Sequence, residues 1–212
     1  MPGLTTLLTL ADSRLPTGGH VHSGGVEEAV TSGLVNDLVT LEAFLRRRIR
    51  TSGLISASVA VAVQTGAVTP ESADLETDAR TPAPAARSAS RAQGRGLLRL
   101  ARRVWPEGAD WSTLGRTPHL GTVAGVVGRA SALEPEHTAL SLVYTTMTGS
   151  ATAAQRLLAL DPADVAAVTF ALSEVCDQTA HDAAVGLADL SDPLLDVLAQ
   201  RHAARERPLF AS

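Results

Sequence analysis

Apolar residues recur along most of the chain at intervals of three or four positions, which is the spacing of one face of an α-helix. The pattern is clearest at Leu38, Leu41, Leu45 and Ile49. Asp37 directly precedes this face and can cap the helix. Residues 54–64 are apolar nearly all round, which predicts a buried central helix. Alternating runs that could form half-buried strands extend over only a few residues, so the sequence predicts an all-α fold.

Prolines and glycines divide this pattern into separate helices. Three dipeptides join a capping side chain to a proline, which is favoured in the first helical turn: Thr69-Pro70, Asp161-Pro162 and Asp192-Pro193. Gly33 is placed to end a helix in the left-handed conformation. The main expected helices cover residues 4–11, 26–32, 38–50, 54–64, 85–104, 120–130, 135–148, 151–160 and 161–185. We expect one domain over residues 1–212, a bundle of about eight to ten helices.

The composition narrows the possible chemistry. Of the 212 residues, 45% are hydrophobic and only 3% are aromatic, so the core is expected to consist of Ala, Val and Leu, whose small side chains let helices approach closely. All 18 basic residues are arginine. A phosphate-binding loop of the G-x-x-x-x-G-K-[ST] type needs a lysine, as does Schiff-base chemistry, so both are excluded. Any nucleotide chemistry must therefore come from a partner.

Charge and cysteine content indicate a cytoplasmic protein. The formal net charge of −4 gives no overall attraction to nucleic acid or to an anionic membrane. The longest apolar run, residues 54–63, is too short to span a bilayer, and the N-terminus lacks the basic start of a secretory signal. Cys176 is the only cysteine, which excludes a disulfide within the chain and fits a reducing compartment. The neighbouring Asp177 is expected to raise the pKa of its thiol.

Few residues are placed to carry chemistry. His20 and His22 lie in a glycine-rich loop and could bind nickel weakly or transiently, although a stable site would need further ligands and plain hydrogen bonding is the alternative. Asp177 and His181 are four apart on one helix face, which predicts an ion pair rather than a catalytic dyad. The motifs G-x-S-x-G, H-E-x-x-H and C-x-x-C do not occur. We therefore predict no catalytic residues and no stably bound cofactor.

One surface feature stands out, an arginine ridge that recurs at every fourth position of the helix expected at residues 85–104. It consists of Arg87, Arg91, Arg95, Arg99 and Arg103. The ridge could be a solvated face, or it could dock on an acidic protein surface, because guanidinium groups pair well with carboxylates. A third use is binding the phosphates of nucleic acid. A helical regulatory protein that binds nucleic acid or an acidic protein through Arg87–Arg103 is thus one functional hypothesis. A small helical enzyme would need clustered acid and base groups, which the sequence does not show.

Four stretches in the same order resemble one family. Residues 8–19, LTLADSRLPTGG, and 22–27, HSGGVE, are similar to the N-terminal UreF pattern L-x-x-S-D-S-x-L-P-x-G-x-F-x-x-S-x-G-L-E. Residues 91–98, RAQGRGLL, resemble a family segment ending in Q-G-x-x-L. Residues 148–158, TGSATAAQRLL, lie where the family has a G-Q-x-x-G-Q-like run, and residues 207–212, RPLFAS, resemble its S-R-L-F-x-S tail. Their order and spacing over nearly the whole chain make the resemblance to the urease accessory protein UreF specific.

The resemblance implies an all-α homodimer that acts as a non-enzymatic scaffold or chaperone. It implies a complex with UreD (also called UreH) and the GTPase UreG that acts on apo-urease and promotes nickel insertion, with nickel passing transiently through the assembly. It also implies that the chain recruits UreG and modulates its GTP hydrolysis. The sequence departs from the family pattern at His20, which replaces an aromatic residue, and at residues 149–152, which lack a glutamine. No family role is assigned at these positions.

Candidate partner-binding residues come from these stretches and from the arginine ridge: Pro16, Gly18, Ser23, Gly24, Glu27, Arg91, Gln93, Arg95, Arg207, Leu209 and Phe210. The loop Pro16–Glu27 is expected at or near a partner surface, the alternative being a structural turn that closes the first helix. The tail, about residues 205–212, is expected to be mobile until it is bound. We expect Leu209 and Phe210 to insert into a groove of the UreD homologue.

Overall fold

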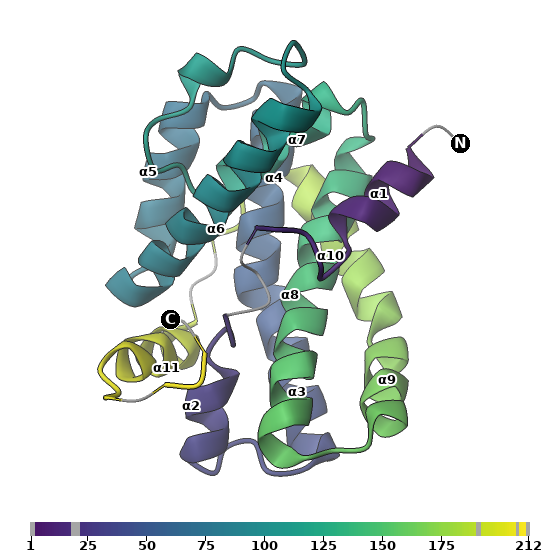
Figure 1. Cartoon of the computed structure of the whole chain (residues 1–212), viewed down its shortest axis with the longest axis vertical. Helices are drawn as coiled ribbons and strands as arrows, with labels where there is room; N and C mark the ends of the chain where they lie inside the picture. Colours follow the sequence, from purple (N-terminus) through teal and green to yellow (C-terminus); the bar gives the residue numbers. More distant parts are fainter. Residues whose placement is uncertain (1–2, 18–21, 190–191, 207, 211–212) are drawn as a thin grey trace.

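The structure is a computed structural model that describes residues 3–17, 22–189, 192–206 and 208–210. The described residues confirm the all-helical class and contain no β-strand. They form eleven α-helices: α1 (Leu4–Leu10), α2 (Val26–Thr31), α3 (Leu38–Arg48), α4 (Leu54–Thr65), α5 (Pro70–Arg80), α6 (Pro84–Val104), α7 (Leu120–Ala130), α8 (Pro135–Leu158), α9 (Pro162–Ala171), α10 (Ser173–Val185) and α11 (Pro193–Ala203) (Figure 1). No helix in this part of the chain is both long and apolar enough to cross a membrane.

The predicted capping residues occupy the expected positions. Asp37 and Thr40 form a reciprocal capping box at the start of α3, in which the Asp37 carboxylate accepts the Thr40 N–H at 2.8 Å. The side chains of Thr69, Asp161 and Asp192 likewise accept backbone N–H groups at the starts of α5, α9 and α11. Each cap satisfies backbone donors that a helix start leaves without partners inside the helix. These local patterns therefore predicted where four helices begin.

The helix expected at residues 38–50 does not end where the sequence suggested. α3 continues into a π-helix, Ile49–Gly53, and the π-helix continues directly into α4, so the three form one continuous rod. The arginines at 46–48 therefore lie within this rod. π-Helices are rare insertions that often occur at functional sites.

Two further helix boundaries differ from the expectation. α8 is continuous through Gly149, because nothing crowds that position and one glycine within a helix costs only about 1 kcal/mol. Residues 161–185 form two helices rather than one, because the chain bends at the buried Leu172 (φ −93°, ψ 0°). The bend allows both α9 and α10 to pack against α8. No proline or glycine marks this bend in the sequence.

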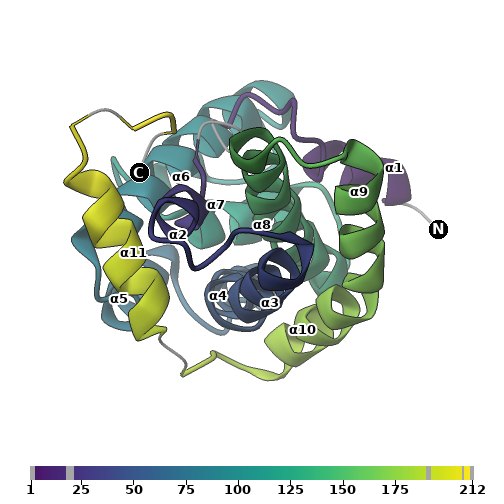
Figure 2. The same ribbon diagram turned by 90° about the horizontal axis from the view of Figure 1, so that it is seen from below.

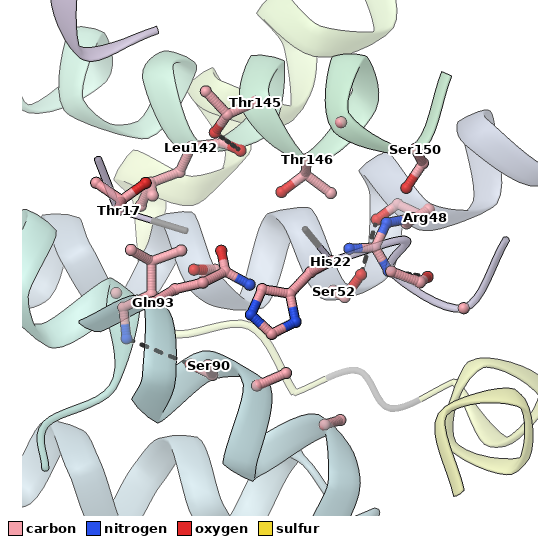
Figure 3. A pocket seen from close by; sticks show the side chains of 18 of the residues that line it. Thr17, His22, Arg48, Ser52, Ser90, Gln93, Leu142, Thr145, Thr146 and Ser150 are labelled. Atoms are coloured by element: carbon pink, nitrogen blue, oxygen red, sulfur yellow. Dashed lines mark hydrogen bonds between the residues drawn. The ribbon is translucent and has the colours of Figure 1, made fainter. Parts of the chain in front are cut away.

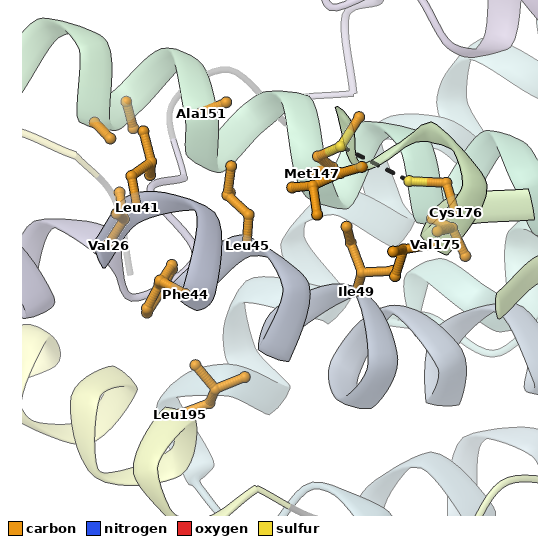
Figure 4. Close-up of a cluster of buried hydrophobic side chains, with 14 of the residues drawn as sticks. Val26, Leu41, Phe44, Leu45, Ile49, Met147, Ala151, Val175, Cys176 and Leu195 are labelled. Carbon is orange, nitrogen blue, oxygen red and sulfur yellow. Dashed lines mark hydrogen bonds between the residues drawn. The ribbon is translucent and has the colours of Figure 1, made fainter. Parts of the chain in front are cut away.

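Two groups of buried apolar side chains hold the helices together. The larger group joins α2, α3, α4, α8, α9, α10 and α11, and its centre includes Leu41, Leu45 and Ile49, none of which is exposed (Figure 4). The smaller group joins α4, α5, α6 and α7 around residues such as Val59 and Val123. Seen from below, α4 and α8 lie near the middle of the molecule, with the other helices around them (Figure 2). α4 contributes to both groups and so connects the two halves of the core.

Glycines allow α7 to pack closely on α4. A Cβ at Gly121 would lie 2.7 Å from the carbonyl oxygen of Ser56. At Gly125 it would collide with the carbonyl oxygen of Ala60 and would lie 2.7 Å from the Cβ of Val63. These glycines lower the intrinsic helix propensity of the segment. In the folded chain, they are what permits the backbones of α4 and α7 to approach.

Candidate functional site

A cavity of about 360 Å³ lies between the N-terminal loop and helices including α3, α6, α8 and α11 (Figure 3). Its lining draws on all four stretches that resemble UreF. Thr17 and residues 22–25 come from the first, Gln93 from the second, Ser150 from the third and Phe210 from the fourth. Segments far apart in the sequence thus meet around one space. This convergence makes the cavity the candidate functional site.

The loop before α2 is held in place from two helices. The Ser150 hydroxyl of α8 donates to the carbonyl of Ser23 at 3.1 Å, and the Arg48 guanidinium donates to the carbonyl of Gly24 at 2.5 Å. Gly24 has a positive φ of 62°, and a Cβ there would collide with the Arg48 guanidinium. Ser23 is buried, whereas Pro16 is exposed. Ser23 and Gly24 are therefore held by α8 and α3, whereas Pro16 is exposed, and partner binding by this loop stays a prediction.

α6 brings the second stretch against the first. Gly96 packs on the backbone of Thr17, where a Cβ would lie 2.6 Å from the carbonyl oxygen. On the inner side of α6, Gln93 faces the cavity. On the outer side, Arg95 and Pro16 line a shallow groove between α6 and the N-terminal loop. Of the candidates in these two stretches, Pro16 and Arg95 therefore share one accessible surface.

The arginine ridge divides into an inward and an outward half. Arg91 donates to Asp78 of α5 at 2.7 Å and lies 3.4 Å from Asp74, while Arg87 lies 3.6 Å from Asp78. The outward half consists of the exposed residues Arg95, Arg99 and Arg103. The ridge is therefore not one continuous cationic face. Arg91, a predicted partner contact, instead fastens α6 to α5 within the chain.

A buried histidine completes this junction. His119 is 0% exposed, its Nε2 lies 2.9 Å from Asp78 and its Nδ1 lies 3.0 Å from the Ser90 hydroxyl. A neutral ring with its proton on Nε2 satisfies both contacts. Burial lowers the pKa of His119, although the hydrogen bond with Asp78 acts in the opposite direction. For Asp78, burial opposes ionisation, but His119 and Arg91 outweigh it and lower the pKa of the carboxyl.

The described part of the tail is held by Glu27. One oxygen of its carboxylate accepts the Leu209 N–H at 2.8 Å, and the other accepts the Phe210 N–H at 3.0 Å and lies 2.7 Å from His202 Nε2. Burial opposes the ionisation of Glu27, but these hydrogen bonds outweigh it and lower its pKa. The sequence suggested a tail that is free until bound. Instead, Phe210 packs against the core and lines the cavity, while Leu209 remains 79% exposed.

The buried Glu27 is therefore an internal anchor rather than an exposed partner contact. Three other predicted residues, Gly18, His20 and Arg207, lie outside the described residues. His22, the second candidate for nickel binding, lines the cavity. Among the described residues, no group of three or more His, Cys, Asp or Glu side chains is arranged to hold a metal ion.

Two remaining predictions concern α10. Burial, followed by the negative charge of Asp177, raises the pKa of the Cys176 thiol to about 11, so the predicted direction is confirmed. His181 lies 3.4 Å from Glu136 of α8 instead of pairing with Asp177, so the predicted ion pair within the helix is wrong. The buried thiol of Cys176 and the contact between His181 and Glu136 are both consistent with a structural role for α10.

Arg48 is a lining residue that the sequence did not single out. It lies seven residues after Leu41 and three after Leu45, so the helical repeat places it on the buried face of α3. Burial lowers the pKa of its guanidinium to about 10, which leaves the group charged at neutral pH. This spacing is present in the sequence, but three consecutive arginines give no sign of which one faces inward.

Comparison with known proteins agrees with the resemblance to UreF of the four stretches that meet at the cavity. Residues 35–173 match the UreF family. Over the full length of both chains, the sequence is 75% identical to the urease accessory protein UreF of Mycolicibacterium vanbaalenii, 72% identical to that of Mycobacterium marinum and 68% identical to that of Mycobacterium tuberculosis H37Ra. The chain therefore belongs to the UreF family of urease accessory proteins.

Proposed function

We propose that this protein is a non-enzymatic scaffold that promotes nickel insertion into apo-urease, together with UreD (UreH) and the GTPase UreG. The observation that carries the proposal is the full-length identity of 68–75% to urease accessory proteins UreF. With no lysine in the chain, nucleotide hydrolysis belongs to the partner, and the scaffold contributes helical surfaces. Nickel passes through the assembly transiently. The scaffold works in the cytoplasm as a homodimer and does not act on nucleic acid or membranes.

Two accessible surfaces support this proposal. One is the exposed Leu209, which the Glu27 anchor presents in a defined position beside α2. An ordered apolar side chain loses less conformational entropy on binding than one in a free tail. The other is the groove at Pro16 and Arg95, which continues along the outward half of the arginine ridge to Arg99. We assign Leu209 to contact with the UreD homologue and the outward arginines to an acidic surface of a partner protein.

Activation of urease in a reconstituted system tests the proposed function. Urease structural subunits are co-expressed with the UreD and UreG homologues, with and without this chain, and urease activity and bound nickel are measured. We expect both to depend on the chain. Active, nickel-loaded urease formed equally well without the chain would refute the scaffold role. GTP hydrolysis by the purified chain alone would refute its non-enzymatic character, and light scattering tests the homodimer.

A single substitution tests the assignment of Leu209. Leu209→Ala is expected to reduce co-purification of the UreD homologue at least about tenfold, as for an exposed apolar anchor at an interface. Leu75→Ala is the matched control, because Leu75 is 67% exposed on α5 and lies in none of the family stretches. Equal co-purification with both variants would remove Leu209 from the interface. Deletion of residues 207–212 is expected to abolish co-purification while helicity measured by circular dichroism remains.

The outward half of the ridge could also bind the phosphates of nucleic acid. A salt titration distinguishes that hypothesis from docking on a partner protein. Arg95, Arg99 and Arg103 are exposed, but the internal contacts of Arg87 and Arg91 shorten the cationic surface. Binding to labelled duplex DNA that falls steeply with added salt would favour nucleic acid. We expect no binding at low salt, and a loss of co-purification with an accessory partner in an Arg99→Glu variant.

A further inference from the structure

Arg48 presents a charge to the cavity, and no described residue forms an ion pair with it. Its Nε atom is shielded from solvent and has no acceptor among the described residues. The one described hydrogen bond of its guanidinium runs to a neutral group, the carbonyl of Gly24. Charged side chains inside proteins are normally paired, because removing an ion from water is costly unless a counter-charge replaces the solvent. An internal guanidinium of this kind is a place where an anion is stabilised.

The carboxylates that line the same cavity are engaged elsewhere. Asp12 binds Arg14, and Asp192 binds Arg47 and caps α11. Asp196 accepts the backbone N–H of residue 83. None of them forms an ion pair with Arg48 in the described part of the chain. The cavity therefore contains a cation whose counter-charge the described chain does not supply.

Neutral donors face the same space. Figure 3 shows Arg48, Thr146 and the ring of His22 around one part of the cavity. The Thr146 hydroxyl forms no hydrogen bond with another described residue, and neither does the Gln93 side chain, which enters the cavity from α6. A guanidinium and a hydroxyl that line one cavity can together bind the acceptor oxygens of an oxyanion. A volume of about 360 Å³ is ample for an anion of a few atoms.

The chain next to Arg48 departs from the regular α-helix in a π-helix. The π-helix begins at Ile49, directly after Arg48, and its extra residue shifts the helical phase between α3 and α4. Ser52, in the same π-helix, donates to the carbonyl of Arg48 at 3.2 Å and also lines the cavity. The insertion thus lies beside the unpaired charge. We propose that the cavity at Arg48 binds a small oxyanion of bicarbonate or phosphate size, held by the Arg48 guanidinium and the Thr146 hydroxyl.

The Nε–H resonance of Arg48 reports directly on such binding. The full chain, labelled with nitrogen-15, is titrated with inorganic phosphate and, separately, with bicarbonate, while sodium chloride keeps the ionic strength constant. An Arg48→Lys variant assigns the resonance. We expect a saturable shift with a Kd of about 1 mM or below for at least one anion. A response to phosphate alone identifies a tetrahedral ligand, and a response to bicarbonate alone identifies a planar one. No saturable shift with either anion would overturn the proposal.

Calorimetric titration of variants tests the two named groups. We expect Arg48→Lys to weaken binding at least about tenfold, because lysine lacks the planar fork of donors, and Thr146→Val to weaken it by up to about tenfold. Arg46→Lys is the matched control, because Arg46 lies on the same helix but pairs with Glu42 at the surface. Circular dichroism checks that each variant folds. Binding to Arg48→Lys and Thr146→Val that equals binding to the unmodified chain would place the anion elsewhere and refute the proposed site.

Discussion

Three consecutive arginines of α3 have three different environments. Arg46 pairs with Glu42 one turn earlier, Arg47 pairs with Asp192 at the start of α11, and Arg48 lines the internal cavity. Successive residues of an α-helix are rotated by about 100°, so neighbours in sequence face different surroundings. Composition alone treats the three as one basic cluster. Their roles follow from helical phase and from what packs against each face.

Glu27 attaches the tail to the rest of the molecule, and replacing this residue tests that role. Glu27→Gln removes the charge that two backbone N–H groups and His202 share, and the side chain is only 3% exposed. We expect a loss of about 2 kcal/mol in the free energy of unfolding, as for a lost charge-assisted hydrogen bond. Limited trypsin digestion should then cleave after Arg205 faster. Glu42→Gln, which removes a surface carboxylate, is the control, and equal cleavage rates in the two variants would contradict the anchor.

At the scale of elements, replacing a glycine of α7 and a glycine of α8 by alanine is expected to change stability in opposite directions. Gly125→Ala is expected to lower the free energy of unfolding by about 2–3 kcal/mol, because the new Cβ would collide with the backbone of α4. Gly149→Ala is expected to raise it by about 1 kcal/mol, because nothing lies near that position and alanine favours the helix. Urea unfolding monitored by circular dichroism measures both. If Gly125→Ala stabilised the chain, α4 and α7 would be less closely packed than the structure shows.

Helix starts were predictable from the sequence, but helix continuity was not. Asp37 and Asp192 act through contacts within their own first turns, so a few neighbouring residues contain the whole signal. The bend at Leu172 and the uninterrupted passage through Gly149 depend on which helices pack alongside. Such packing is a property of the tertiary structure. It overrides the weak preferences that a single glycine or leucine contributes.

At the scale of the whole molecule, the sequence indicated the stretches that matter but not the cavity they enclose. Residues 8–19, 22–27, 91–98, 148–158 and 207–212 were identified by resemblance, and described residues in each stretch contribute to the lining or to the contacts that hold it. Their meeting depends on long-range contacts such as Ser150 to the carbonyl of residue 23. A linear pattern does not contain such pairings. For the same reason, the division of the arginine ridge between Asp78 and the surface could not be predicted.

Acid sensitivity of the folded chain follows from the junction of α5, α6 and α7. Burial lowers the pKa of His119 below its ordinary value of about 6.5, so in the acid range below that value the unfolded chain binds more protons than the folded one. Stability must then fall as the pH decreases through about 6.5. The slope contributed by one such group is at most about 1.4 kcal/mol per pH unit. The pKa values of Asp78 and Glu27 are also lowered, and their contributions are lost only below about pH 4.5, where carboxylates are protonated.

Urea unfolding at pH 7.5, 6.5 and 5.5 separates these contributions, because the carboxylates stay ionised throughout that range. The unmodified chain should lose stability between the second and third values. His119→Asn should be less stable at pH 7.5, since it disrupts the contacts with Asp78 and Ser90, but it should lose the slope that His119 contributes. His181→Asn, at a largely exposed position, should retain the slope. If His119→Asn kept the full slope, the proton would be taken up elsewhere, and His119 would not be the group that couples folding to pH in this range.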